Sequence, residues 1–162
     1  MTESETEFCW QSETDTERVA QAWARSAALG NCTLAFHGPL GVGKTTLTRH
    51  VLRALGVQGR IKSPTYALVE SYELAPDCGV PEAWHFDFYR LDDPTEWEEA
   101  GLRDTFSAPG LKIVEWLEKA GDQAPAVDLH VTLAFGPDET SRQVNMRAVT
   151  PTGVRLIEAL TR

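Results

Sequence analysis

The order of apolar and polar positions along the chain predicts a succession of strands and helices. Residues 32–37 (CTLAFH) and 111–116 (LKIVEW) are short apolar runs of the kind found in buried strands. Residues 65–74 and 83–89 are also rich in aromatic and aliphatic side chains, and a connection containing Pro, Gly and Asp separates them. We therefore expect each of these segments to form a strand.

Helical spacing predicts helices between these runs. Thr14 and Glu17 form a capping box, after which apolar side chains recur every four residues until Gly30 ends the helix. A second helix is expected to end at Gly56, and its apolar positions are Leu47, Val51, Leu52 and Leu55. A short third helix is expected to open at Asp93, because a proline follows this capping residue.

The last part of the chain contains two segments that alternate in polarity around a turn. Residues 128–135 and 142–149 therefore predict a hairpin at one edge of the sheet. Residues 154–160 are expected to form a closing helix, and the acidic residues 1–13 a tail or a short strand. Strands that alternate with helices in this way indicate an α/β fold.

Composition excludes several classes of protein. Apolar residues make up 42% of the chain and aromatic residues 9%, which is enough for a core and excludes wholesale disorder. No run reaches the roughly 18 apolar residues of a membrane helix, and the acidic N-terminus does not resemble a secretion signal. The cysteines form no CxxC pair, which argues against a disulfide framework or a zinc knuckle. We expect a single domain over residues 1–162 that works in the cytoplasm, without a membrane.

The strongest chemical signal is the segment 38–45, GPLGVGKT, which fits the phosphate-loop pattern GxxxxGK[ST]. Glycines allow the backbone to fold around phosphate, and the start of the following helix adds the positive end of its dipole. Lys44 is placed to reach the β- and γ-phosphates, and Thr45 to ligate Mg²⁺. The residues expected to bind nucleotide here are Gly38, Gly41, Val42, Gly43, Lys44, Thr45 and Thr46.

The distribution of charge supports this interpretation. The net charge is −9, yet residues 18–69, which contain the phosphate loop, carry seven basic residues and no acidic one. Acids there would repel a triphosphate, whereas basic side chains raise the local potential; they include Arg49, Arg53, Arg60 and Lys62. Alternatively, the arginines of the helix are solvated or dock on an acidic partner. The overall negative charge argues against direct binding of tRNA.

Two acidic residues at predicted strand ends are candidate metal ligands. Asp87 and Glu115 each close an apolar run, and the carboxyl ends of strands in α/β sheets face the ligand crevice. Either carboxylate suits Mg²⁺, and Glu115 is also able to orient an attacking water. His85 shares the strand face of Asp87, where a packed, hydrogen-bonded histidine is a more common finding than a ligand.

Two further positions allow two interpretations each. Trp116 either lies against the nucleotide or packs in the core. Residues 63–65 (Ser-Pro-Thr) follow the basic loop that contains Arg60 and Lys62. They form either a sensor of the γ-phosphate or a plain turn before a strand, and the residues alone favour neither.

Four motifs in order, GPLGVGKTT, KSPTYALVESY, HFDFYRL and VEW, resemble those of the TsaE (YjeE) family of bacterial P-loop ATPases. The resemblance runs from about residue 14 to residue 152. It implies a P-loop NTPase-like three-layer fold, with a mostly parallel central sheet extended by antiparallel edge strands. Members of this family act with TsaC, TsaB and TsaD to form N6-threonylcarbamoyladenosine at position 37 of tRNAs that read ANN codons. TsaD performs the transfer, and TsaE binds the TsaB–TsaD complex and hydrolyses ATP.

The resemblance also implies roles for single residues, with ATP and Mg²⁺ as cofactors. It implies that Lys44 binds phosphate and that Thr45 binds Mg²⁺. Asp87 becomes the Walker-B-like acid, and Thr65 within Ser-Pro-Thr becomes the switch residue. Glu115 becomes a functional acid on Mg²⁺ or on water.

The resemblance also places Trp116 beside the nucleotide and Arg142 near the base. Two positions depart from the family pattern. Pro39 stands where the family usually has Asp or Asn, and Leu117 replaces the proline that commonly follows Glu-Trp. These departures affect the stiffness of the loop and the aim of Trp116.

The function expected from these features is a Mg²⁺-dependent ATPase that is slow without its TsaB–TsaD partner and is a monomer or weak oligomer when free. One alternative is a small-molecule kinase on the same scaffold, which would need an arginine-rich lid. The second half of the chain is acidic and holds only scattered arginines. Another alternative is a nucleotide-dependent binding switch whose hydrolysis is incidental.

Overall fold

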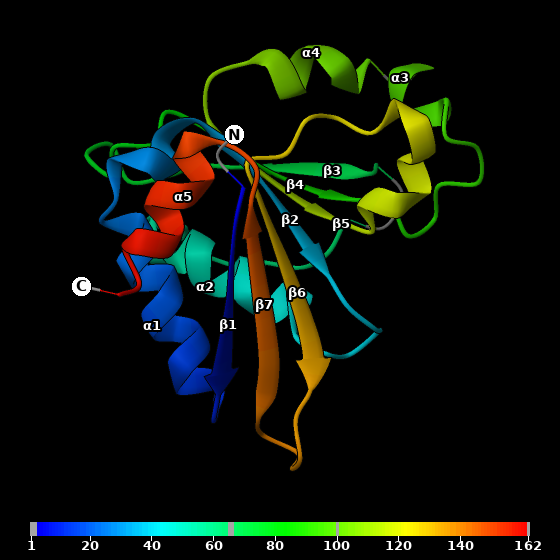
Figure 1. The fold of residues 1–162 in the computed structure, drawn as a ribbon. Helices are drawn as coiled ribbons and strands as arrows, with labels where there is room; N and C mark the ends of the chain where they lie inside the picture. The colour runs from blue at the N-terminus through cyan, green and yellow to red at the C-terminus, as the bar shows by residue number, and fades with distance from the viewer. Residues whose placement is uncertain (1–2, 65–66, 100, 162) are drawn as a thin grey trace.

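The structure is a computed structural model, and it describes residues 3–64, 67–99 and 101–161. A seven-stranded sheet runs through the molecule in the order β1-β7-β6-β2-β5-β4-β3 (Figure 1). The strands are β1 (Ser4–Trp10), β2 (Cys32–His37), β3 (Val69–Tyr72), β4 (Ala83–Asp87), β5 (Leu111–Glu115), β6 (Leu129–Phe135) and β7 (Arg142–Ala148).

The centre of the sheet is parallel and its flanks are antiparallel. Strands β6, β2, β5 and β4 run in one direction, whereas β7 and β1 on one side and β3 on the other run antiparallel to their neighbours. This arrangement confirms the expected mostly parallel sheet with antiparallel extensions. The predicted β6–β7 hairpin is present, but its expected position at the sheet edge is wrong, because β1 pairs with β7 on the outside.

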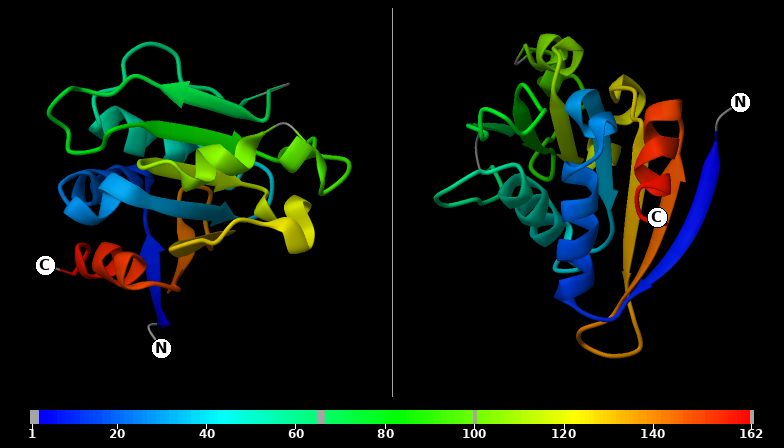
Figure 2. Two further views of the ribbon diagram at one scale, coloured as in Figure 1. Left: turned by 90° about the horizontal axis from the view of Figure 1, so that it is seen from above. Right: turned by 90° about the vertical axis from the view of Figure 1, so that its left-hand side faces the viewer.

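Helices cover both faces of the sheet and complete the three layers that were expected (Figure 2). One face carries α1 (Glu13–Ala24), α2 (Lys44–Ala54) and α5 (Pro151–Glu158), which share a core with β2, β6 and β7. The other face carries α3 (Glu96–Glu99), α4 (Leu102–Ser107) and the 3-10 helix Leu117–Gln123. No helix of the described residues is long and apolar enough to cross a lipid bilayer.

Strand β2 shows why the central strands are continuous apolar runs. Leu34 and Phe36 point into the core beneath α1 and α2, whereas Ala35 points into the core on the opposite face. All three side chains are 0% exposed. A strand that is buried on both faces needs mostly apolar residues, and four of the six residues of β2 are apolar.

Several element boundaries differ from those expected. Helix α1 is capped by Ser12, not Thr14, and ends at Ala24; the expected Gly30 stop lies in a separate 3-10 helix, Ala27–Asn31. Helix α5 begins earlier than expected because the Thr150 hydroxyl caps it by accepting a hydrogen bond from the Gly153 N–H group. In the described part of the predicted strand 65–74, only Val69–Tyr72 is extended.

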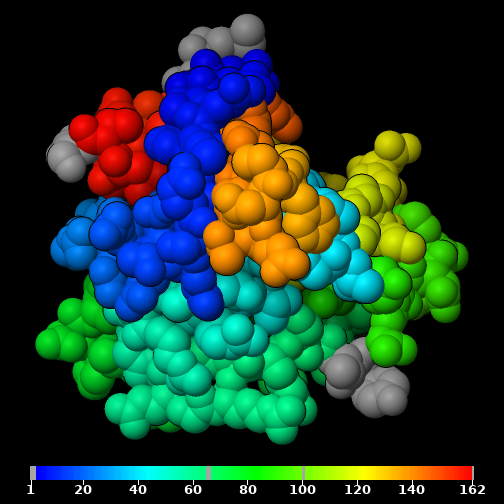
Figure 3. All heavy atoms as spheres, turned by 90° about the horizontal axis from the view of Figure 1, so that it is seen from below, coloured from blue at the N-terminus to red at the C-terminus, as the bar shows by residue number. Residues whose placement is uncertain are grey.

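The topology brings three chain segments together at the carboxyl ends of the central strands. The phosphate loop follows β2, Asp87 ends β4 and Glu115 ends β5, and these three strands are parallel neighbours. Their carboxyl ends therefore meet, which is where α/β sheets bind ligands. Seen from below, the turn of the β6–β7 hairpin and the segment from the phosphate loop through α2 lie on this face (Figure 3).

Candidate functional site

The phosphate loop has the backbone that its glycines permit. Gly38, Gly41 and Gly43 have φ values of 138°, 79° and 119°, a region that residues with a side chain rarely adopt. A Cβ atom at Gly38 would also collide with the backbone oxygen of Leu133. Gly43 caps α2 and has no side chain to occupy the first N–H groups of the helix. The loop can thus offer backbone donors to an anion.

Lys44 spans this loop from the first residue of α2. Its ammonium group donates a hydrogen bond to the Gly38 carbonyl oxygen and lies 3.8 Å from the ring centre of Trp116. The residue is 5% exposed, and burial lowers the pKa of Lys44, which the Glu115 carboxylate partly opposes. The structure therefore places one buried positive charge between the phosphate loop and the acidic strand ends.

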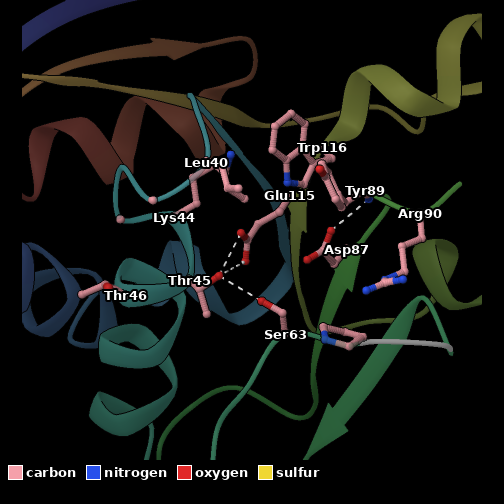
Figure 4. Close-up of a pocket in the computed structure, with 13 residues that line it drawn as sticks. Leu40, Lys44, Thr45, Thr46, Ser63, Asp87, Tyr89, Arg90, Glu115 and Trp116 are labelled. Carbon is pink, nitrogen blue, oxygen red and sulfur yellow. Dashed lines mark hydrogen bonds between the residues drawn. The ribbon is translucent and has the colours of Figure 1, made fainter.

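Thr45 joins the phosphate loop to β5 (Figure 4). Its hydroxyl lies 3.1 and 3.2 Å from the two carboxylate oxygens of Glu115 and 3.0 Å from the hydroxyl of Ser63. Glu115 is 2% exposed, and its Oε2 atom also lies 2.5 Å from Nε2 of the buried His85. A hydroxyl and a carboxylate that already contact each other form part of a hard-oxygen donor set.

Asp87 adds the second carboxylate. It is the direct neighbour of Glu115 in the parallel pairing of β4 with β5, and its Oδ1 atom accepts a hydrogen bond of 2.9 Å from the Tyr89 N–H group. Burial raises the pKa of Asp87, the Tyr89 N–H group opposes this, and the Glu115 carboxylate raises the pKa further. Asp87 is half-buried beside the buried Glu115, and two neighbouring carboxylates repel each other, a repulsion that a divalent cation relieves.

Trp116 has contacts both in the core and in the cavity. It packs against the core beneath α3 and α4, and it also lines the cavity with Tyr89, whose ring centre is 5.0 Å away. Its φ of 60° is unusual for a residue with a large side chain. Such backbone strain is common at functional sites, and here it turns the indole towards Lys44.

These side chains surround one cavity of about 340 Å³. A second cavity of about 410 Å³ lies on the other side of the phosphate loop, and the two share Gly41, Gly43 and Thr46. The second cavity is lined by residues at the start of α1, by Val42 and by Arg142 of β7. The Arg142 guanidinium donates a hydrogen bond of 2.7 Å to the Val42 carbonyl oxygen, which ties β7 to the phosphate loop.

The predicted site residues divide between these two cavities. The first is lined by Gly41, Gly43, Lys44, Thr45, Thr46, Asp87, Glu115 and Trp116. The second is lined by Gly41, Val42, Gly43, Thr46 and Arg142. Gly38 begins the loop and accepts the hydrogen bond from Lys44. Thr65 lies outside the described residues, so its expected switch role stays a prediction.

Sequence reasoning missed the contribution of the chain's beginning. Trp10, Ser12, Thr14 and Thr16 line the second cavity, and no ligand-binding motif marks them; the sequence marks Thr14 only as part of a capping box. Of the basic side chains expected near the phosphates, Arg53 instead donates to backbone carbonyl oxygens of Val57 and Gly59 at the far end of α2. Its helical position could have revealed this, because arginines in a last turn often bind free carbonyl groups.

Comparisons with known proteins agree with this geometry. The family model described as threonylcarbamoyl adenosine biosynthesis protein TsaE matches residues 10–144. The curated protein named tRNA threonylcarbamoyladenosine biosynthesis protein TsaE of Haemophilus influenzae is 42% identical over 125 residues, which cover 77% of this chain and 75% of that protein. The protein of the same name from Bacillus subtilis is 32% identical over 148 residues, covering 91% and 89%.

A solved structure agrees as well. The crystal structure of YdiB from Bacillus subtilis superposes with a TM-score of 0.77 at 25% identity, and the match covers 100% of this chain and 97% of that one. The family match spans both sides of the phosphate loop, from Trp10 in the second cavity to Val144 beyond Arg142. The chain therefore belongs to the TsaE family of threonylcarbamoyl adenosine biosynthesis proteins.

Proposed function

We propose that this chain is a Mg²⁺-dependent ATPase that serves the formation of threonylcarbamoyladenosine in tRNA. One observation carries the proposal: Lys44 and Thr45 at the start of α2 and Glu115 at the end of β5 converge on a single cavity beside the phosphate loop. Family membership supports the biosynthetic role.

In this proposal, the loop binds the phosphates. The backbone N–H groups at the start of α2 and the ammonium group of Lys44 face a chain of negative charges. Phosphate oxygens would replace the Gly38 carbonyl oxygen as the acceptor for Lys44. The new bonds are stronger because both partners are charged.

The donors near Thr45 suit Mg²⁺. The Thr45 hydroxyl and the carboxylates of Glu115 and Asp87 are hard oxygen donors, and all three line the same cavity. When bound, the ion would draw charge from the β- and γ-phosphate oxygens. Because the Thr45 hydroxyl contacts Glu115, its proton can stay on that hydrogen bond while a lone pair faces the metal. An oxygen of Asp87 that does not bind Tyr89 can accept a bond from a water near the γ-phosphate.

We further propose that the base and ribose occupy the second cavity. It adjoins the first cavity, which we call the phosphate cavity. The two share Gly41, Gly43 and Thr46, so a single nucleotide can extend from one cavity into the other. Arg142 and the buried Trp10 provide a cation and an aromatic side chain there, which suits a purine. Competition of ATP, GTP and CTP for the site would measure how selective this cavity is.

The mouth of the phosphate cavity also has features of a partner surface. Leu40 on the loop is 72% exposed and Tyr89 is 49% exposed, and both line the cavity. Large exposed apolar side chains at a site suit a protein that covers it. This supports the TsaB–TsaD complex as the partner, with slow hydrolysis in its absence. The net charge of −9 is unsuited to direct tRNA contact, and we expect the work to take place in the cytoplasm.

Reconstituted tRNA modification tests this function. A mixture of TsaC, TsaB, TsaD, tRNA, ATP and the small-molecule substrates of the modification is assayed with this chain, with the Lys44→Ala variant, or with neither. We expect wild type to sustain many modifications per TsaD and the variant to allow about as few as the mixture without this chain. Equal yields in all three mixtures would contradict the role. Phosphate found on a small metabolite instead of free phosphate would favour the kinase alternative.

A further inference from the structure

His85 is a buried polar residue that neither the phosphate loop nor the acidic ligands explain. It lies on β4, two residues before Asp87, and is 0% exposed. Burying an imidazole costs free energy unless a hydrogen bond compensates for the lost water. An apolar side chain would fill the same space without that cost, so the imidazole calls for a polar task.

Within the part of the chain that the structure describes, the imidazole ring has one hydrogen-bond contact. Its Nε2 atom lies 2.5 Å from Oε2 of Glu115, and among the described residues its Nδ1 atom has no hydrogen-bond partner. We assign the ring proton to Nε2, because Nδ1 then carries a lone pair and no N–H group is left without an acceptor. In this tautomer, His85 donates to Glu115.

The contact fixes the direction of the Glu115 carboxylate. The Thr45 hydroxyl reaches both carboxylate oxygens, at 3.1 and 3.2 Å, and cannot by itself select one rotation of the group. His85 holds Oε2 from the neighbouring strand β4, so the contacts of His85 and Thr45 together fix the rotation of the carboxylate at the cavity. Neighbours that hold a ligand in this way usually determine how well a metal binds.

We propose that His85 is a positioning residue that orients Glu115 for a divalent cation bound beside Thr45. The inference rests on the proposed Mg²⁺–nucleotide site and adds to it a residue that touches neither the nucleotide nor the ion. His85 acts through the hydrogen bond to Glu115, so a side chain that keeps a donor at the position of Nε2 preserves the function.

Metal affinity in a nucleotide complex provides the test, without any measurement of activity. Each variant is mixed with ADP, and Mg²⁺ is titrated in while calorimetry records the half-saturating concentration. We expect His85→Leu to raise that concentration by about 10-fold or more, as loss of such a supporting residue usually does. The affinity for ADP in the presence of a chelator should change far less, because the phosphate loop remains intact.

Two amide variants separate positioning from packing. His85→Gln places its side-chain N–H₂ group near the position of Nε2, whereas the shorter His85→Asn cannot reach Glu115. We expect Gln to restore a half-saturating Mg²⁺ concentration close to that of wild type and Asn to resemble Leu. Equal concentrations for Gln and Asn would overturn the proposal, and this comparison holds even where the Leu variant fails to fold.

Ile113→Val is the matched control for lost packing. Ile113 is the direct neighbour of His85 in the β4–β5 pairing, is 0% exposed and lines neither cavity. The Ile113→Val substitution should lower the melting temperature of the protein and leave Mg²⁺ binding unchanged. A Leu variant that behaves in the same way would show that His85 only packs, and the inference alone would fail. A wild type that binds no ADP would overturn the proposed function and this inference with it.

Discussion

The two cavities beside the phosphate loop differ in how the chain builds them. The phosphate cavity is formed where parallel strands end, and its charged side chains belong to recognisable motifs around Lys44, Asp87 and Glu115. The second cavity is formed by the start of α1, the end of β1 and the antiparallel strand β7. Its lining residues are apolar or hydroxyl-bearing, with few charges. The parallel centre of the sheet thus positions most of the charged side chains, and the antiparallel flank with the start of α1 forms a cavity with few charges.

The largest effect is expected from loss of the cation in the phosphate cavity. Lys44→Ala removes the ammonium group that reaches into the phosphate loop. Among the described residues of α2 that line this cavity, Lys44 is the only one with a charge. Bonds between charged groups are worth about 2–3 kcal/mol, so the affinity for ATP should fall by about 100-fold in calorimetry.

Lys112→Ala is the matched control for this change. Lys112 is also a buried lysine near a tryptophan, Trp84, but it lies outside both cavities. It should leave the affinity for ATP unchanged. A similar loss in both variants would mean that lowered stability, and not the phosphate contact, weakens binding.

The next effect concerns the metal side of the same cavity. Glu115→Gln keeps the shape of the side chain but removes its negative charge, so Mg²⁺ should improve nucleotide binding about 10-fold less than in wild type. The affinity for ATP in a chelator should stay the same or rise, because a negative charge near the phosphates is lost. Glu118→Gln, at a neighbouring exposed acid, is the control and should behave as wild type. Unchanged Mg²⁺ dependence in Glu115→Gln would separate Glu115 from the metal.

A smaller effect is expected in the second cavity. Arg142→Ala removes the guanidinium that lines this cavity and binds the Val42 carbonyl oxygen. We expect a loss of about 1 kcal/mol, which is about 5-fold in affinity, with the Mg²⁺ dependence unchanged. Arg147→Ala, on the same strand but paired with Glu3, is the control. If Arg142→Ala changed the Mg²⁺ dependence, the two cavities would not act separately.

The smallest effect is expected from the caps of two helices. Ser12→Ala removes the cap of α1, and Ser12 itself lines the second cavity. Thr150→Ala removes the cap of α5, and Thr150 lines neither cavity. Each should lower the free energy of unfolding by about 1 kcal/mol in urea titrations. Only Ser12→Ala should also weaken nucleotide binding, and only slightly. Equal weakening in both would attribute the effect to stability.

The difference between the parallel centre and the antiparallel flanks of the sheet also explains which parts of the fold could be predicted. The central strands β2, β4 and β5 are rich in apolar side chains, so their burial on both faces is visible in the sequence. Strand β1 alternates acids with other residues and was expected as a tail or a short strand. It is ordered by partners on β7, since Glu5 accepts a hydrogen bond from Asn145 and Glu3 pairs with Arg147. Partners so far apart in the chain leave no local signal.

The candidate site shows the same limit. The prediction that Lys44 and Thr45 are ligands follows from the spacing of their motif, and the structure places both at the cavity. The contact of Thr45 with Glu115 depends on the order of the strands and on side-chain rotation, which no local pattern encodes. The residues at the start of α1 reach the second cavity only because β1 joins the sheet beside β7.

Steady-state phosphate release tests the central claim most directly. Wild type and Lys44→Ala are each assayed with ATP and Mg²⁺, with and without TsaB–TsaD. The account predicts slow release by wild type alone, a changed rate when the complex is added, and release at background level by the variant in both mixtures. Equal rates in all four mixtures would contradict it.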